Sequence, residues 1–210
     1  MNHYKTTFET WNKLASQYQE KFMEIDLYND SYALFCQQLE KPAARIFEIG
    51  CGPGNITKYL LSQRPDFKIY GIDVAPNMIE LAKHNNPTAD FKVMDCRKIN
   101  TINEKFDGII CGFCMPYLSK EECQQLLLDC DALLTVGGAL YFSAIEGDYK
   151  KSNYETSSDG QHTMFVYYHQ VDYLLETLGE NHFEIVALQR KEYPKKDKIE
   201  IHMIFIAKKK

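Results

Sequence analysis

The chain of 210 residues is 45% hydrophobic and 25% charged, which predicts one folded globular domain with an ordinary apolar core. Its formal net charge of −5 disfavours binding to nucleic acid, because contacts with phosphates draw on clustered Lys and Arg. The sequence has neither an apolar run of the ~20 residues that a membrane helix needs nor an apolar leader after a basic start, so we expect a cytoplasmic protein with no membrane partner.

The first 42 residues predict two helices. Thr6-x-x-Glu9 has the pattern of a capping box at the start of the first one. A second helix is expected over residues 30–39, with Pro42 marking its end. The first helix should be amphipathic, because apolar residues recur at helical spacing at Phe8, Trp11, Leu14, Ala15, Tyr18 and Phe22.

From residue 45 onward, apolar runs alternate with helical patterns, which predicts an α/β sheet. Ser119-x-x-Glu122 is a second capping box, and Gly137-Gly138 is expected to end the helix that follows it. The expected strands cover residues 45–50, 67–73, 89–95, 106–112 and 139–146, and the expected helices cover residues 56–63, 76–84 and 120–135.

The last third of the chain completes the domain. Residues 147–160 are polar and form a longer connection than those before it, and long connections in compact domains often carry function. A helix is expected near residues 171–178. Two further strands, at 183–191 and 199–207, read as a hairpin. The whole chain, residues 1–210, is therefore interpreted as a single domain.

The seven cysteines predict neither a disulfide nor a metal site. Their number is odd, and most of them fall inside expected strands and helices. Cys111-x-x-Cys114 has a spacing found in zinc sites, but no second Cys or His pair completes it. We interpret the cysteines as reduced thiols of the core.

The turn after the first expected strand carries the strongest functional signal, Gly50-Cys51-Gly52-Pro53-Gly54. Glycines lack a Cβ atom, so a ligand can lie against the backbone, and the helix start that follows favours negative charge. The second strand ends in Asp73, roughly 20 residues on, where a carboxylate can hold a ribose diol. These features predict a ligand of the adenosine type.

An NAD(P)-dependent oxidoreductase is one alternative that shares this turn. Its fingerprint is G-x-G-x-x-G, whereas Asn55 follows Gly54 here, so the third glycine falls one residue early. About 40 residues of helical pattern also precede the first strand, where nicotinamide-binding domains tend to begin with a strand. Both observations disfavour this alternative.

Four segments together resemble the ordered motifs of class I S-adenosylmethionine-dependent methyltransferases: residues 48–54, 71–73, 94–96 and 106–110. The resemblance implies a doubly wound, mostly parallel sheet of seven strands with a C-terminal antiparallel hairpin strand and N-terminal helices. It also implies S-adenosylmethionine as cofactor and methyl transfer to an acceptor, for which we expect a small molecule. A non-catalytic S-adenosylmethionine-binding protein is a further alternative.

For the methionine end of the cofactor, the resemblance implies five residues. The backbone of Gly50, Cys51 and Gly52 would approach it closely. Glu48 would lie near the amino group, although an ion pair at the sheet edge is the competing interpretation. Tyr18 would lie near the carboxylate, or it is a core aromatic of its amphipathic helix.

For the nucleoside end, Asp73 would accept hydrogen bonds from both ribose hydroxyls. Val74 and Met78 would pack on the faces of the adenine, although either residue also suits the core. At the edge of the adenine, the Asp95 side chain would accept from the exocyclic amine and the Cys96 backbone would donate to the ring. All five assignments follow from the resemblance.

The acceptor site is the least defined part of the sequence interpretation. Cys111, at the exit of the fourth strand, would lie beside the sulfonium. Tyr117, Glu146 and His162 are candidates for catalytic roles, but the relatives' histidines in the segment after strand four are replaced here by Pro116 and Tyr117. We expect residues 1–42 to form a helical lid and residues 147–169 a substrate-side excursion.

Overall fold

The computed structural model describes residues 3–157, 160–195 and 198–210. Within them the chain forms a seven-stranded mixed sheet in which one strand, β9, runs antiparallel to its neighbours. The α/β class, the doubly wound arrangement and the C-terminal hairpin strand are thereby confirmed. In spatial order the strands are β3 (Asp90–Val93), β2 (Lys68–Asp73), β1 (Arg45–Ile49), β4 (Phe106–Cys111), β5 (Leu134–Ile145), β9 (Ile199–Lys209) and β8 (Phe183–Pro194).

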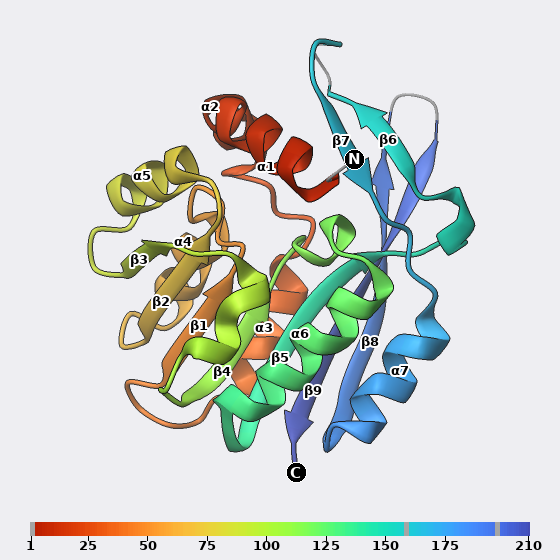
Figure 1. Ribbon diagram of the computed structural model, residues 1–210. Helices are drawn as coiled ribbons and strands as arrows, with labels where there is room; N and C mark the ends of the chain where they lie inside the picture. Colours follow the sequence, from red (N-terminus) through yellow and green to blue (C-terminus); the bar gives the residue numbers. More distant parts are fainter. Residues whose placement is uncertain (1–2, 158–159, 196–197) are drawn as a thin grey trace.

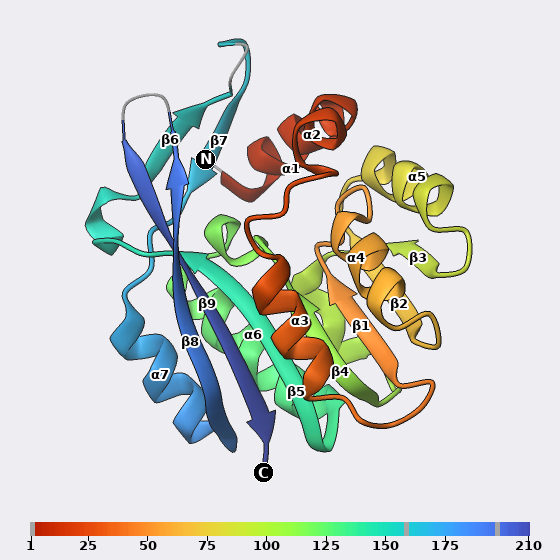
Figure 2. The same cartoon turned by 180° about the vertical axis from the view of Figure 1, so that it is seen from behind.

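Helices cover both faces of this sheet, as Figures 1 and 2 show from opposite sides. Successive strand residues point to opposite faces, so Ile46 packs with one helical layer and Phe47 with the other. With both faces covered, the strands read as nearly continuous apolar runs. One layer contains α3 (Asn29–Gln37), α4 (Asn55–Gln63) and α5 (Pro76–Asn85), and the other contains η1 (Cys96–Thr101), α6 (Lys120–Leu133) and α7 (Val171–Glu180).

The strand order reverses between β1 and β4, which pair with each other in parallel. Such a switch point leaves a crevice at the carboxyl ends of the strands, where ligands of this fold class bind. Above that edge lie α1 (His3–Lys13), α2 (Ala15–Phe22) and a small second sheet formed by β6 (Asn153–Thr156) and β7 (Thr163–Val166) (Figure 1).

Polar contacts join α1 to the small sheet. The Thr10 hydroxyl donates to the Thr163 carbonyl at 2.7 Å, and the Phe165 N–H donates to the Thr7 hydroxyl at 3.0 Å. Both threonines are buried, although a helix usually places such residues outward. The N-terminal helix and the polar segment after β5 therefore form one layer over the sheet edge.

The predicted N-terminal helix is two helices in the structure. It begins at His3, ahead of Thr6, so the predicted capping box is wrong, and it breaks at Leu14, whose ψ of 10° leaves the helical range. The break lets α1 contact β7 while α2 packs against α5. The third helix, α3, is not part of this cover, because it packs against α4 and the sheet. Among the described residues of the predicted 1–42 lid, α1 and α2 are the helices that lie over the edge.

Two other boundaries differ from the prediction. Strand β5 begins at Leu134, which pairs with Phe106, so Gly137 and Gly138 lie inside the strand instead of ending a helix. The residue pairing shifts between Phe106 and Gly108, and the positive φ of Gly137, 77°, fits this irregularity. The polar segment after β5 contains η3 (Tyr149–Lys151) and β6 where a loop was expected.

The capping box at Ser119 is present with both of its hydrogen bonds, as predicted. No helix in the described ranges combines the length and the apolar content that crossing a membrane requires. The cysteines of the described chain are unpaired, and no group of three or more His, Cys, Asp or Glu within it could hold a metal ion.

Candidate active site

A pocket of about 730 Å³, including its open mouth, lies at the carboxyl edge of the sheet beneath α1 and α2. Its walls come from the N-terminal helices, the glycine turn, the end of β2 and the loop after β4. The lining residues are Tyr4, Thr7, Phe8, Trp11, Tyr18, Gly50, Gly52, Asp73, Val74, Met78, Met94, Cys96, Gly112, Phe113, Cys114 and Tyr117.

The glycine turn forms the floor of the pocket. Gly50 and Gly52 have φ values of 68° and 52°, a region that side-chain-bearing residues rarely adopt. A Cβ on Gly50 would lie 3.0 Å from the Cβ of Cys114, and one on Gly52 would lie 3.7 Å from the Tyr18 ring. The turn therefore presents bare backbone to the pocket, as the sequence predicted.

Asp73 ends β2 and lines the pocket beside this turn. One carboxylate oxygen accepts the Gly52 N–H at 3.0 Å, and the other accepts the Ala75 N–H at 2.8 Å. Burial raises the pKa of Asp73, and these hydrogen bonds oppose the rise. The carboxylate thus fixes the glycine turn and the start of α5 in one arrangement, and each of its oxygens keeps a lone pair for a further donor.

Three more of the predicted cofactor residues line the pocket: Val74, Met78 and Cys96. Met78 packs in a cluster with Ala15 of α2, where Tyr18 also makes contact. Met78 therefore belongs to a buried cluster and also lines the pocket. Tyr18, which the sequence left between two roles, also lines the pocket.

Glu48 does not line the pocket. Its side chain is completely buried on the α4 side of β1, where the Thr57 hydroxyl donates to Oε2 and Oε1 has no partner among the described residues. Burial raises the pKa of Glu48 to about 8, the Thr57 hydrogen bond opposes this rise, and the charge of Asp73 adds to it. The competing sequence interpretation, an ion pair at the sheet edge, is wrong because the described chain places no cation on this carboxyl group.

Cys51, Asp95 and Cys111 are also outside the pocket lining. Cys51 packs with Phe91 and α5. Side chains alternate between the two faces of the sheet along β4, and Cys111 points into the core that α6 covers. Gly112, the next residue, lines the pocket. Asp95 caps η1 and pairs with Arg97 at 2.7 Å.

The contacts of Asp95 also lower the pKa of its carboxyl group. Burial alone would raise the pKa of this carboxyl group, but hydrogen bonds from Arg97 outweigh that effect and the pKa is lowered. The Tyr4 hydroxyl donates to the same carboxylate at 3.1 Å. Tyr4 lines the pocket, so Asp95 contacts a wall residue of the site while its own oxygens face Arg97 and Tyr4.

The three catalytic candidates lie in different places. Tyr117 lines the pocket, next to Trp11 at a ring distance of 5.6 Å. Glu146 forms an ion pair with Arg190 at 2.6 Å on the outer part of the sheet edge. His162 precedes β7, and its backbone N–H donates to the Ser157 hydroxyl at 3.0 Å. Of the three, only Tyr117 is a wall of the pocket.

The sequence predicted a lid over residues 1–42 but did not assign the residues of α1 that line the pocket. Tyr4, Thr7, Phe8 and Trp11 all line the pocket, and they follow helical spacing on one side of α1. The available signal was an apolar stripe on a helix that precedes the first strand and has no assigned place in the core. Met94 and Cys114 were likewise not assigned to the pocket.

Comparisons with known proteins show similarity to methyltransferases. Residues 46–138 match the family described as "Methyltransferase domain". "Putative methyltransferase 235L" of Invertebrate iridescent virus 6 is 34% identical over 118 residues, 56% of this chain and 42% of that protein. A tRNA N(3)-methylcytidine methyltransferase of Schizosaccharomyces pombe is 23% identical over 167 residues, 74% of this chain and 66% of that protein. The chain thus spans less than two thirds of either curated relative.

Among solved structures, the 1,6-didemethyltoxoflavin-N1-methyltransferase of Burkholderia thailandensis superimposes with a TM-score of 0.71. The match covers 98% of this chain and 88% of that one, at 20% sequence identity. That structure contains bound 1,6-didemethyltoxoflavin and S-adenosylhomocysteine. At this level of identity the likeness establishes the fold.

Proposed function

We propose that this chain, which carries a class I S-adenosylmethionine-dependent methyltransferase domain at residues 46–138, transfers the methyl group of S-adenosylmethionine to a small-molecule acceptor. The match confirms the resemblance that the sequence motifs indicated, and S-adenosylmethionine is the cofactor of this domain. The bound sulfonium supplies an activated methyl carbon. The protein therefore has to align the two reactants and exclude water, and alignment alone can supply ~7–11 kcal/mol.

The observation that carries the proposal is the joint position of the glycine turn and Asp73 in one pocket. In this proposal the ribose hydroxyls donate to the carboxylate of Asp73, on the lone pairs that its backbone hydrogen bonds leave free. The methionine end lies along Gly50 and Gly52, where no Cβ intervenes. Val74 and Met78 pack on the adenine.

Glu48 and Asp95 then act from behind the pocket walls. Glu48 holds Thr57 in the first turn of α4, the helix that begins at the glycine turn. Asp95 holds Tyr4 of α1 by a hydrogen bond, and so ties the cover of the pocket to the start of η1. We assign both residues to positioning the site.

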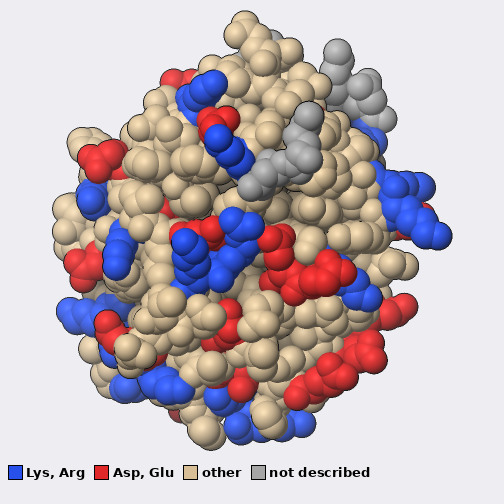
Figure 3. Space-filling view, viewed as in Figure 1, with Lys and Arg blue, Asp and Glu red and all other residues tan. Residues whose placement is uncertain are grey.

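A small acceptor is supported by the cover of the pocket and by the surface charge. Helices α1 and α2 lie over the pocket, and aromatic residues of this cover, among them Phe8 and Trp11, line it. On the face of the molecule in Figure 3, Lys and Arg are interspersed with Asp and Glu, without a continuous basic surface for phosphates. The Schizosaccharomyces pombe relative is named as a tRNA enzyme, so RNA is the acceptor class to test against.

A thermal-shift panel followed by transfer assays tests the proposal. S-adenosylmethionine and S-adenosylhomocysteine should raise the melting temperature, since ligands of the native state stabilise it by RT ln(1 + [L]/Kd), and NAD(H) and NADP(H) should not. A shift from the nicotinamide cofactors alone would contradict the assignment. Methyl-labelled cofactor is then offered with a small-metabolite extract or with total tRNA. Label in the tRNA would overturn the small-molecule acceptor, and cofactor binding without transfer to either would favour a non-catalytic binding protein.

A further inference from the structure

Two thiols lie against each other in the wall of the cofactor pocket. Cys96 begins η1 and is 5% exposed, whereas Cys114 follows β4 and is partly exposed. The Cys114 thiol donates to Sγ of Cys96, and the two sulfur atoms are 3.6 Å apart. Both residues line the pocket, so the pair borders a space with an open mouth.

This position sets the pair apart from the other cysteines. The other five are buried and line no part of the pocket: Cys36, Cys51, Cys111, Cys123 and Cys130. Buried cysteines in apolar surroundings are usually inert, whereas modification needs access to the sulfur. Cys114 has that access, and a second thiol lies within contact distance of it.

The pair also lies where the cofactor is expected. A Cβ placed on Gly50 would lie 3.0 Å from the Cβ of Cys114 and 3.5 Å from its Sγ, so Cys114 contacts the glycine turn. The proposed function places the methionine end of the cofactor along this turn. The family resemblance places Cys96 at the edge of the adenine. A bond between the two sulfurs would therefore join two parts of the wall that the cofactor contacts.

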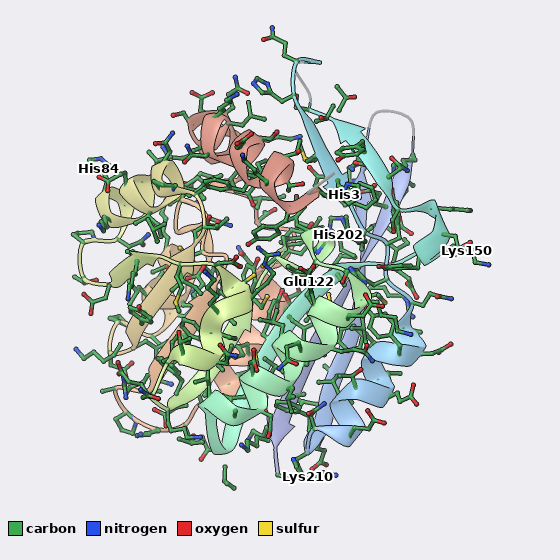
Figure 4. All side chains as sticks on the ribbon, viewed as in Figure 1. His3, His84, Glu122, Lys150, His202 and Lys210 are labelled. Carbon is green, nitrogen blue, oxygen red and sulfur yellow. The ribbon has the colours of Figure 1, made fainter. Side chains whose placement is uncertain are left out.

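Contacts on both sides hold the pair in place. Glu122 of α6, labelled in Figure 4, pairs with Arg97 at 3.0 Å and so holds the residue after Cys96. On the other side, the N–H of Phe113, which precedes the second thiol, donates to the Ser143 hydroxyl at 2.8 Å. A disulfide would shorten the distance between the sulfurs from 3.6 Å to ~2.05 Å. Because both flanks are held, part of this closure displaces the pocket wall.

We propose that Cys96 and Cys114 form an oxidative modification site, at which a hydroperoxide that enters the pocket produces a disulfide and thereby lowers the affinity for the cofactor. Cys114, the partly exposed thiol, is oxidised first, and Cys96 is the resolving thiol beside it. The effect on the cofactor rests on the proposed function, whereas formation of the bond does not.

The two steps balance with hydrogen peroxide as the oxidant. The sulfur of Cys114 attacks one peroxide oxygen, the O–O bond breaks, and a sulfenic acid and one water form. The sulfur of Cys96 then attacks the sulfenic sulfur, the S–O bond breaks, and a second water leaves with the proton of the Cys96 thiol. In sum, two thiols lose two electrons to one peroxide and give one disulfide and two waters.

Both thiols are protonated at neutral pH. Its hydrogen bond with Cys111 and its burial raise the pKa of Cys114, while the hydrogen bond to Cys96 opposes this rise. The hydrogen bond from Cys114 and burial raise the pKa of Cys96. Because the thiolate is the nucleophile, the first step is slow. The pair therefore responds to sustained exposure to the oxidant.

The test incubates the reduced protein with hydrogen peroxide for hours at mildly alkaline pH, with and without saturating S-adenosylhomocysteine. Free thiols are then blocked in denaturant, and peptide mapping by mass spectrometry without reductant locates the disulfides. We expect a Cys96–Cys114 bond as the main product, and the ligand should slow its formation because both thiols line the pocket. Oxidation should weaken S-adenosylhomocysteine binding in calorimetry by about tenfold or more, and a dithiol reductant should restore it.

Two substitutions to serine complete the test. Cys114→Ser removes the thiol that is oxidised first, so peroxide should leave the affinity of this variant for S-adenosylhomocysteine at its own untreated value. Cys36→Ser, in α3 and away from the pocket, is the matched control and should form the bond and lose affinity as wild type does. Should Cys114→Ser not fold, Cys96→Ser removes the resolving thiol and is expected to form no disulfide with Cys114.

The affinity of reduced wild type for S-adenosylhomocysteine, measured first, separates the failures. If it does not bind, the proposed function fails, and the peptide map alone decides on the bond. If it binds, three results each overturn the modification site while the proposed function stands: no Cys96–Cys114 bond, a bond without loss of affinity, or formation of the bond at an equal rate with the ligand present. Loss of affinity in peroxide-treated Cys114→Ser would also overturn it.

Discussion

The variant Glu48→Gln should be less stable than wild type at low pH and more stable than wild type at high pH. Glu48 is completely buried with one hydrogen bond, and its pKa is raised from the ordinary 4.5 to about 8 because burial penalises the carboxylate. Between these two values the folded chain keeps a proton that the unfolded chain releases. The free energy of unfolding therefore falls as the pH rises through this window and levels off above about 8.

The magnitude follows from the two pKa values. The difference between about 8 and 4.5, at roughly 1.36 kcal/mol for each pKa unit, puts the loss for wild type on the order of 5 kcal/mol. Gln carries no charge and escapes this loss. Its amide donors, however, are buried beside Thr57 without an acceptor, at a cost of about 1–3 kcal/mol at every pH. Glu48→Gln should therefore be the less stable protein at pH 5 and the more stable one at pH 9.

Urea unfolding followed by far-ultraviolet circular dichroism at the two pH values measures both differences. Comparing variant and wild type at the same pH removes the contributions of titrating groups that do not interact with Glu48. Glu80→Gln is the control, because it makes the same chemical change at a side chain that is 77% exposed and leaves the buried carboxyl group in place. If Glu48→Gln is destabilised equally at pH 5 and pH 9, the carboxyl is already ionised in the folded protein and the reasoning is refuted.

Three further predictions concern the pocket. Asp73→Ala should weaken S-adenosylhomocysteine binding by about 10- to 150-fold in calorimetry, the equivalent of ~1.5–3 kcal/mol, and unchanged affinity would mean that the ribose is held elsewhere. Gly50→Ala should lower both the melting temperature and the cofactor affinity, because the φ of Gly50 is 68° and the new Cβ would lie 3.0 Å from the Cβ of Cys114. If the variant melts at the same temperature as wild type, this strain is absent. Once an acceptor is known, Tyr117→Phe should raise its KM or lower kcat with cofactor affinity nearly unchanged, because Tyr117 lines the pocket, and an equal loss of cofactor binding would contradict its place on the acceptor side.

The sheet and the glycine turn could be predicted because local chemistry determines them. The doubly covered strands leave apolar runs in the sequence, and the turn requires glycines where φ is positive, as at Gly50 and Gly52. Asp73 could be placed in the pocket for the same reason, since the end of a parallel strand fixes which sheet edge a residue reaches. These assignments need no knowledge of distant contacts.

The features that the sequence did not predict depend on contacts between segments that are distant in the chain. The break at Leu14 follows from anchoring α1 to β7, some 150 residues away in the chain, through contacts such as Thr10 with Thr163. Cys111 was expected beside the sulfonium, but side chains alternate between the faces of the sheet along β4 and the Cys111 side chain lies in the core. His202 stayed hidden inside an apolar strand pattern, where nothing local indicates that a buried histidine stands there.

Trp11 gives the molecule a built-in optical probe. It is the only tryptophan of the chain, and its ring lies in the pocket wall between Tyr18 at 5.3 Å and Tyr117 at 5.6 Å. The indole fluorescence of the whole protein therefore originates at this wall. Under the proposed function, arrival of either reactant would change the polarity around a single emitter. Stopped-flow fluorescence would then resolve the order in which cofactor and acceptor enter and their products depart, without any label.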